Sequence, residues 1–142
     1  MINSNVMSQI DIFEATSCKP EYVAAVNRLL LQLCSSPCEM SAEQLQNLVN
    51  EPNSRLLLLT VDGEVMGMCT VGFYTSPTGR KAWIEDVVVD AQCRGLHLGE
   101  RLVASLSARA STRSCLPRDH RAWLLTDSIR RWGSNARRQT CI

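Results

Sequence analysis

The chain has 142 residues, of which 45% are hydrophobic, 20% charged and 5% aromatic. This is the length and composition of one globular domain, which excludes a disordered or fibrous protein. The formal net charge of +1 hides a division along the chain: residues 1–108 hold seven Lys or Arg against twelve Asp or Glu, whereas residues 109–142 hold eight Arg against two Asp. We therefore predict one domain over 1–142, with an acidic body over 1–110 and an atypical Arg-rich segment over 111–142.

The sequence predicts neither a membrane protein nor a secreted one. Its longest leucine run, Leu56–Leu59, is far shorter than the roughly 18–20 apolar residues that span a bilayer. Residues 1–10 lack the basic segment and apolar core of a secretory signal. The seven cysteines are odd in number and irregularly spaced, and His97 and His120 lie too far apart to complete a zinc site. We expect a cytoplasmic protein with no membrane partner and no metal.

The first predicted strand covers Ile10–Ala15, where apolar and polar side chains alternate. Pro20 suits the first turn of a helix, and apolar residues then recur at helical spacing as far as Cys34. A second helix is predicted after Ser41, because Ser41 and Gln44 have the spacing of a capping box, and it ends before Pro52.

Three consecutive strands are predicted next, over Arg55–Val61, Glu64–Thr75 and Lys81–Val89. Asp62-Gly63 is a strong hairpin signal between the first two. Gly67 and Gly72 indicate a bulge or a close backbone approach, and Trp83 is expected to pack against the sheet. A last helix follows over Leu98–Ala110. This order predicts a layered α+β (α/β) domain with a mostly antiparallel sheet flanked by helices.

The most informative segment joins the last strand to the last helix, through the loop Arg94-Gly95-Leu96-His97-Leu98-Gly99. The free amides of a helix N-terminus and of a glycine loop can together bind an anion such as phosphate. Arg94 can add a charge-assisted hydrogen bond. The alternative is a plain strand-to-helix connection with a solvent-facing arginine.

The segment Ile84–Gly99 resembles motif A of the GCN5-related N-acetyltransferase (GNAT) superfamily, in which a strand, a loop of the form Gln/Arg-x-x-Gly-x-Gly/Ala and a helix bind the pyrophosphate of acetyl-CoA. Gln92, Gly95 and His97 fall on the three defined positions, with His97 in place of the usual small residue. The run Ile84–Asp90 is especially similar to glucosamine-6-phosphate N-acetyltransferases. The order of elements upstream matches the family as well.

The resemblance implies the GNAT fold and an N-acetyltransferase that transfers acetyl directly from acetyl-CoA to a small-molecule primary amine. It implies that Val87, Val88 and Val89 hold the acetyl-pantetheine arm. The other cofactor-binding residues that it implies are Gln92, Arg94, Gly95, Leu96, His97, Leu98, Gly99 and Glu100.

Glu85 and Asp86 are the candidate catalytic residues. An alkyl amine has a pKa of about 10 and must lose a proton before it attacks, which a carboxylate can bring about. Adjacent residues of a strand face opposite sides of the sheet unless a bulge intervenes, so we expect one of the two, with a preference for Glu85, to act as base or to bind the amine. The alternative is a pair of structural acids satisfied by Arg80, Lys81 or backbone amides.

The segment 111–142 departs from the family pattern, so the resemblance predicts an atypical or truncated C-terminus. Family members carry a tyrosine and a Gly-Phe turn after motif A, whereas both tyrosines here, Tyr22 and Tyr74, precede it. The stretch Ala122–Thr126 is the one candidate strand in this segment. An alternative function is therefore a catalytically impaired module that binds CoA or a partner. We expect no nucleic-acid partner despite the arginines, and a missing final strand would favour a homodimer.

Overall fold

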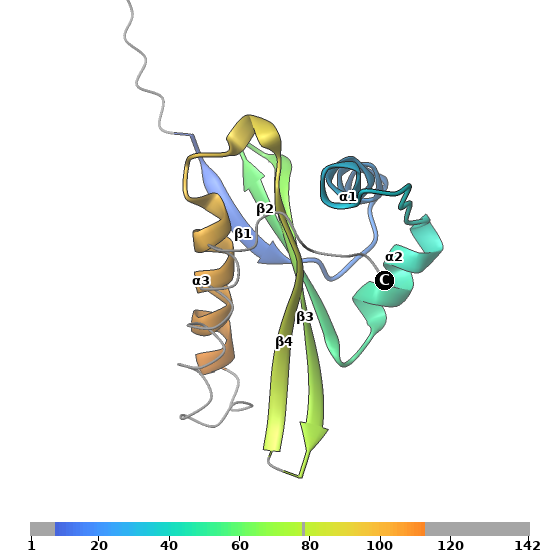
Figure 1. The fold of residues 1–142 in the computed structure, drawn as a ribbon, viewed down its shortest axis with the longest axis vertical. Coiled ribbons are helices and arrows are strands. Elements are labelled where there is room, and N and C mark those ends of the chain that lie inside the picture. The colour runs from blue at the N-terminus through green and yellow to red at the C-terminus, as the bar shows by residue number, and fades with distance from the viewer. Residues whose placement is uncertain (1–7, 78, 113–142) are drawn as a thin grey trace, which may run out of the picture.

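The computed structural model describes residues 8–77 and 79–112, in which four antiparallel strands form one sheet in the order β1-β2-β3-β4. Helices α1 and α2 lie on one face of the sheet and α3 lies on the other (Figure 1). The elements are β1 (Ile10–Glu14), α1 (Pro20–Leu33), α2 (Ala42–Asn50), β2 (Ser54–Val61), β3 (Glu64–Ser76), β4 (Gly79–Val89), the short 3-10 helix η1 (Ala91–Cys93) and α3 (Leu98–Thr112).

The predicted elements are confirmed, with ends that differ by no more than two residues. Pro20 opens α1, and Ser41 and Gln44 form the expected capping box, because each side chain bonds to the backbone amide of the other residue. Asp62 and Gly63 both have positive φ in the turn between β2 and β3, as the hairpin signal requires. The α+β class is therefore confirmed, whereas the candidate strand Ala122–Thr126 lies outside the described residues.

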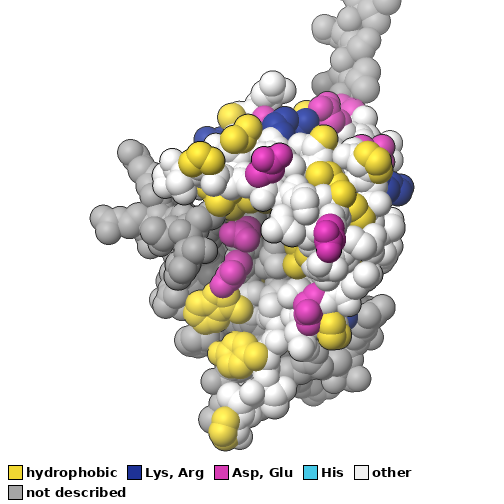
Figure 2. All heavy atoms as spheres, turned by 90° about the vertical axis from the view of Figure 1, so that its right-hand side faces the viewer, with side chains coloured by type: hydrophobic (Ala, Val, Ile, Leu, Met, Phe, Trp, Pro, Cys, Tyr) yellow, Lys and Arg dark blue, Asp and Glu magenta, His cyan; other side chains and the backbone are white. Residues whose placement is uncertain are grey.

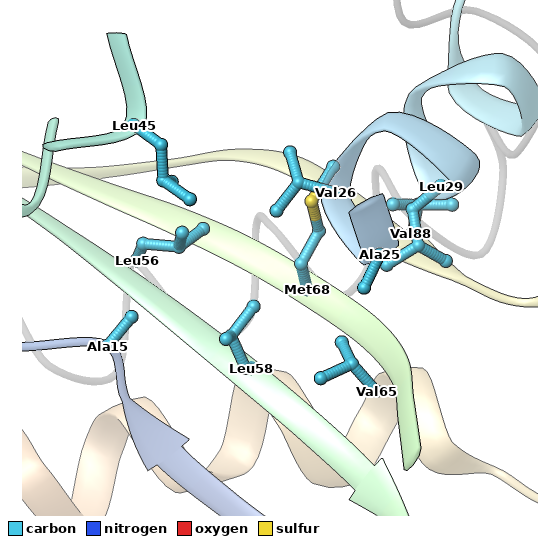
Figure 3. Packing of buried hydrophobic residues seen from close by; sticks show 10 residues of the cluster. All are labelled: Ala15, Ala25, Val26, Leu29, Leu45, Leu56, Leu58, Val65, Met68 and Val88. Carbon is cyan, nitrogen blue, oxygen red and sulfur yellow. The ribbon is translucent and has the colours of Figure 1, made fainter. Parts of the chain in front are cut away.

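The leucine run of β2 is buried on both faces, because each face of the sheet carries its own hydrophobic core. Leu56 and Leu58 point toward α1 and α2 and belong to a core cluster that also contains Leu29, Leu45 and Met68 (Figure 3). Leu57 and Leu59 point the opposite way, toward α3. A strand in the middle of a three-layer packing needs apolar side chains at every position, which explains why this run does not alternate.

The pairing of β3 with β4 contains a bulge. Met68 pairs with Val88 and Thr70 pairs with Glu85, so Cys69 of β3 is opposed by two residues of β4, Asp86 and Val87. A bulge of this kind leaves one residue outside the ladder and increases the local twist of the strand.

Gly67 and Gly72 of β3 differ in how closely the neighbouring backbone approaches them. At Gly67 a Cβ atom would lie 3.2 Å from the carbonyl oxygen of Val88, so the expected close backbone approach is confirmed there. At Gly72 nothing lies within 4 Å of such a Cβ, and the same expectation is wrong. Trp83 is 47% exposed, so part of it is covered, and the expectation that it packs against the sheet stays a prediction. The tip of the β3–β4 hairpin extends beyond the helices (Figure 1).

Candidate active site

The candidate site begins at Asp86, the extra residue of the β4 bulge. Its φ of 53° is left-handed, a conformation that costs most side chains about 1–2 kcal/mol but that Asp and Asn adopt more readily than others. Burial raises the pKa of the Asp86 carboxyl above its usual value, although part of the residue remains exposed. A carboxylate with a raised pKa is a better proton acceptor for an amine.

Glu85 precedes the bulge, and its position in the strand decides which face it occupies. Ile84 packs in the α3 core and Val88 packs in the core beneath α1 and α2. Since side chains alternate along β4 before the bulge, Glu85 lies on the same side as α1 and α2, where it is exposed. The bulge also breaks the simple alternation of Glu85 with Asp86, so the assumption that they must face opposite sides does not apply.

The three valines that follow the bulge offer a ligand their backbone rather than their side chains. Val87 and Val88 are 9% and 6% exposed and pack in opposite cores, and Val89 packs against the α3 core. The Asp90 N–H donates to the Met66 carbonyl oxygen at 2.7 Å, which directs it toward β3. Because N–H groups alternate along a strand, the Val89 amide points away from β3. Within the described ranges β4 is one of the two edge strands, so its side away from β3 carries no described strand.

The loop between η1 and α3 contains two left-handed residues, Gly95 with φ 85° and His97 with φ 55°. The first helical hydrogen bond of α3 runs from the Arg101 N–H to the His97 carbonyl, at 3.2 Å. The amides of the preceding residues, Leu98 to Glu100, are therefore the ones that the helix geometry leaves without an intrahelical acceptor. Successive backbone N–H groups in a turn before a helix N-terminus can form a concavity that suits an anion.

The side chain of His97 is directed into solvent rather than into the loop. It is 78% exposed, and its Nδ1 lies 3.6 Å from Oε2 of Glu100, one turn along α3. Arg94 and Leu96 are exposed as well, with 60% of Leu96 accessible, and Gln92 is also exposed, whereas Leu98 and Gly99 are buried. The loop residues from Arg94 to His97 are therefore accessible at the surface. The buried side chain of Leu98 packs the start of α3 into the core.

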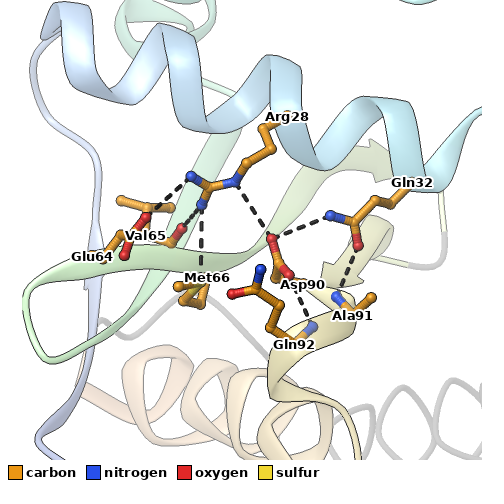
Figure 4. A network of polar contacts seen from close by, with 8 residues as sticks. All are labelled: Arg28, Gln32, Glu64, Val65, Met66, Asp90, Ala91 and Gln92. Carbon is orange, nitrogen blue, oxygen red and sulfur yellow. Dashed lines mark hydrogen bonds and ion pairs between the residues drawn. The ribbon is translucent and has the colours of Figure 1, made fainter.

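Asp90 connects this loop to α1 through contacts that the sequence did not indicate (Figure 4). Its Oδ1 accepts a hydrogen bond from the Gln92 amide at 3.0 Å, and its Oδ2 accepts one from Gln32 Nε2 at 3.2 Å. Gln32 also accepts a hydrogen bond from the Ala91 amide at 2.9 Å through its Oε1. Arg28 Nε lies 3.4 Å from the same Oδ2. Both α1 side chains therefore hold the residues at which the loop begins.

The environment of Asp90 favours its ionised form. The Gln92 amide, above all, holds the pKa of this carboxyl below its usual value, and Gln32 and the charges of Arg28 and Arg94 act in the same direction, while burial opposes them. The polar residues Arg28 and Gln32, four apart on a helix with an otherwise apolar face, are the signal that could have located this network. However, the sequence pattern does not indicate that the partner of these residues is Asp90, more than fifty residues further along the chain.

The described residues form neither a metal cluster nor a membrane-spanning helix. No group of three or more His, Cys, Asp or Glu in residues 8–77 and 79–112 is arranged to hold a metal ion. Among the helices of that same part of the chain, none is both long enough and apolar enough to cross a bilayer.

The fold resembles many solved acetyltransferases. Glucosamine-6-phosphate N-acetyltransferase from Arabidopsis thaliana superposes with a TM-score of 0.62 at 16% identity, over 94% of this chain and 95% of that one. An aminoglycoside acetyltransferase from an uncultured soil metagenomic sample gives 0.65 at 13% identity, over 94% and 92%. Ribosomal-protein-alanine N-acetyltransferase from Brucella melitensis gives 0.64 at 17% identity, over 94% of each chain. At these identities the likeness shows the fold alone.

The sequence itself provides the family. No curated protein matches the chain. The sequence model of the Acetyltransferase (GNAT) family matches residues 23–127, a range that includes the bulge, the loop and α3. Because this match covers well over half of the chain, the protein belongs to the GNAT family of acetyltransferases.

Proposed function

We propose that the protein is an acetyl-CoA-dependent N-acetyltransferase that acts on a small-molecule primary amine. The observation that carries this proposal is the continuity of the bulged strand, the left-handed loop at Gly95 and His97, and the start of α3. A carboxyl with a raised pKa, an outward strand amide and a loop with two left-handed residues follow one another along this part of the chain, and together they support the proposal.

The cofactor site that we propose uses backbone groups for most of its contacts. The amides from Gly95 to Glu100 would bind the phosphates of acetyl-CoA, assisted by the partial positive charge of the α3 N-terminus and by Arg94. The Val87 to Val89 backbone would bind the pantetheine arm. The usual small residue of the third motif position is replaced by His97, whose exposed side chain lies beside Glu100 and leaves the backbone of the loop accessible.

We propose that the chain's own residues accept a proton from the amine and stabilise the carbonyl oxygen of the thioester. Bound acetyl-CoA would supply an activated acetyl group: a C–N bond to the amine forms, the C–S bond of the thioester breaks, and the CoA thiolate leaves and takes up a proton from solvent. Asp86 or Glu85 accepts the proton that the amine must lose, directly or through a water molecule. An outward amide of β4, such as that of Val89, donates to the carbonyl oxygen on which negative charge develops. Holding the two reactants together contributes roughly 7–11 kcal/mol in favourable cases.

The proposed acceptor class rests on Glu85 and Asp86, because two neighbouring acidic residues that are accessible at the surface suit a cationic amine. Two of the solved neighbours are named for amino-sugar-type substrates and one for a ribosomal protein, and the fold they share serves both. We propose a cytoplasmic location from the cysteine usage of the sequence, since a reducing compartment keeps thiols such as the buried Cys69 and Cys93 free.

The proposal is tested by calorimetric titration with acetyl-CoA, followed by an assay of thiol release with a panel of primary amines. We expect saturable binding and amine-dependent thiol release. Binding without release would identify a CoA-binding module with no catalysis, and the absence of binding would reject both functions.

A matched pair of variants at Gly95 tests the loop itself. Gly95→Glu should abolish acetyl-CoA binding, because it places bulk and negative charge where the phosphates would lie. Gly95→Asn should retain most of the binding, since Asn adopts left-handed φ and no atom lies within 4 Å of a Cβ at this position. Equal losses in the two variants would contradict a phosphate-binding role for the loop.

A further inference from the structure

Two large aromatic side chains of the β3–β4 hairpin are exposed without serving either core. Tyr74 is 49% exposed and Trp83 is 47% exposed. Trp83 pairs with Gly72, and Tyr74 lies two residues further along β3. Exposed aromatic residues that lie together are uncommon on a monomer surface and commonly mark a binding site.

Strand alternation places both aromatic residues on the side of the sheet that carries α1 and α2. Phe73 and Ile84 pack in the α3 core, so their neighbours Tyr74 and Trp83 point to the opposite side. Glu85, two residues after Trp83, shares that side. Figure 2 looks onto this side and shows acidic side chains close to exposed hydrophobic ones toward the end of the molecule where Figure 1 places the β3–β4 hairpin.

The position opposite Trp83 is open. Gly72 has no side chain, and nothing lies within 4 Å of the place where its Cβ would be. A cross-strand partner would normally cover part of the Trp83 ring, because directly paired side chains lie about 4.5–5.5 Å apart. The missing side chain therefore leaves space beside the indole on the same face as Glu85.

We propose that Tyr74, Trp83 and Glu85, together termed the aromatic–acidic platform, bind the acceptor of the proposed acetyl transfer and select a primary amine carried on a ring. The ring packs against Trp83 and Tyr74, and the ammonium group lies at Glu85, next to Asp86. This inference rests on the proposed function and names the substrate class of that same site.

Dimensions and charge favour this ligand over others. Residues two apart on a strand are separated by about 6.6 Å, which suits a ring joined to its amine by a short link. A protonated amine complements Glu85 and the excess of acidic residues in 1–108. Aromatic faces attract cations and the apolar faces of rings alike.

The test compares wild type with Trp83→Ala and Tyr74→Ala on pairs of primary amines that have equal carbon numbers, such as 2-phenylethylamine and n-octylamine. We expect kcat/KM for the ring-bearing amine to fall roughly 3- to 10-fold in each variant, with little change for the open-chain amine. The affinity for acetyl-CoA should stay unchanged, which also shows that the variants are folded. Trp83→Phe should restore most of the activity with the ring-bearing amine.

Leu31→Ala is the matched control, because Leu31 is 73% exposed on α1 and does not belong to the platform. It should leave the kinetics with both amines unchanged. Equal effects of Trp83→Ala on the two amines, or no effect on either, would overturn the inference while the proposed function stands.

Two further outcomes separate the remaining explanations. If wild type binds acetyl-CoA but releases no thiol with any amine, the proposed function fails and the inference fails with it. Sedimentation equilibrium examines a second copy of the chain as the occupant: a wild-type dimer that Trp83→Ala converts to monomer would show a subunit interface, and it would overturn the assignment of the platform to the acceptor.

Discussion

Arg28 in the middle of α1 lies beside Asp90, the residue that follows β4, with 3.4 Å between Nε and Oδ2. Asp90 is 5% exposed, so this ion pair is shielded on the carboxylate side. The other arm of the guanidinium reaches Oε1 of Glu64 at 3.3 Å, where the Glu64 side chain is 63% exposed. One arginine thus holds a buried acid and an exposed acid, which allows the two kinds of contact to be compared.

We predict that Asp90→Ala lowers the free energy of unfolding by about 2–3 kcal/mol, because it removes charge-assisted bonds and leaves Gln32 and the Gln92 amide without their acceptor. Glu64→Gln should cost no more than about 1 kcal/mol, since its pair with Arg28 is exposed to solvent. Urea unfolding followed by circular dichroism measures both. Equal changes in the free energy of unfolding of the two variants would show that the burial of Asp90 adds nothing to the strength of its contacts.

The lowered pKa of Asp90 predicts a pH dependence of stability with a definite sign. An acid whose folded pKa lies below its unfolded value of about 3.9 stabilises the fold above that value, and the contribution is lost as pH falls through the folded pKa. The stability difference between wild type and Asp90→Asn should therefore be constant from neutral pH to about 5 and shrink below about 4. Urea midpoints of both proteins across this range provide the measurement, and a difference that grows on acidification would contradict the assignment.

The contribution of Asp86 to the pH dependence of stability should have the opposite sign to that of Asp90. Because its folded pKa is raised by burial, ionisation of Asp86 destabilises the fold as pH rises from the unfolded pKa of about 3.9 through the folded one. Asp86→Asn, which retains the tolerance for left-handed φ, should be more stable than wild type at pH 7 and should lose this advantage in acid. The measurement is again the urea midpoint.

The same Asp86→Asn variant should lose activity while it gains stability. Removal of a general base typically lowers the rate by about 10²–10⁴-fold. In wild type, kcat/KM should fall on acidification at a pH above the ordinary pKa of an aspartate. The variant should lack this fall. Asp62→Asn is the matched control, because Asp62 is also a left-handed aspartate, with φ 52°, but lies in the turn between β2 and β3. If Glu85→Gln alone abolishes this fall, Glu85 is the base.

His97→Gly should stabilise the loop or leave it unchanged. Glycine relieves the left-handed strain of His97, a gain of about 1 kcal/mol that the greater entropy of the unfolded chain partly offsets. Since the imidazole is largely exposed, acetyl-CoA affinity should change less than threefold, whereas His97→Val should weaken it through strain. Thermal unfolding and calorimetric titration test the pair, and a large loss of affinity in His97→Gly would show that the imidazole itself binds the cofactor.

Cys69, which faces the bulge from β3, should be inert to thiol reagents in the native protein. It is completely buried, and burial raises the pKa of its thiol to about 12, so almost no thiolate is present at pH 8. Peptide mapping after alkylation should find Cys69 unmodified in the native state and modified in urea. Native modification at a rate similar to that of the partly exposed Cys18 would mean that the bulge opens readily.

The helices and strands could be predicted from the sequence because local chemistry determines their ends. Pro20 fixes the first turn of α1, Ser41 and Gln44 cap α2, and Asp62-Gly63 provides the turn of the hairpin. Motif A likewise indicated the loop at Gly95 from residues that are close together in the chain. Such signals act over a few residues, and the structure places them where the sequence predicts.

The remaining features depend on residues far apart in the chain. Asp90 meets Arg28 only because the sheet brings the end of β4 beneath α1. The bulge has no glycine to signal it, since Asp86 itself occupies the left-handed position. The residue type alone likewise could not indicate that 47% of Trp83 is exposed. Which of Glu85 and Asp86 faces a given side of the sheet depends on this bulge, and the sequence alone does not indicate it.

Apart from Asp86, the side chains of β4 on either side of the bulge point to the same faces of the sheet as they would in a regular strand. Ile84, Val87 and Val89 face α3, while Val88 faces α1 and α2, as does Glu85 by alternation. With Asp86 removed from the chain, these residues would still alternate, and both cores would keep their valines. A protein shortened by this single residue should therefore fold with a continuous β3–β4 ladder. The packing of the domain does not require the extra residue, so its role would lie in the chemistry at the strand edge.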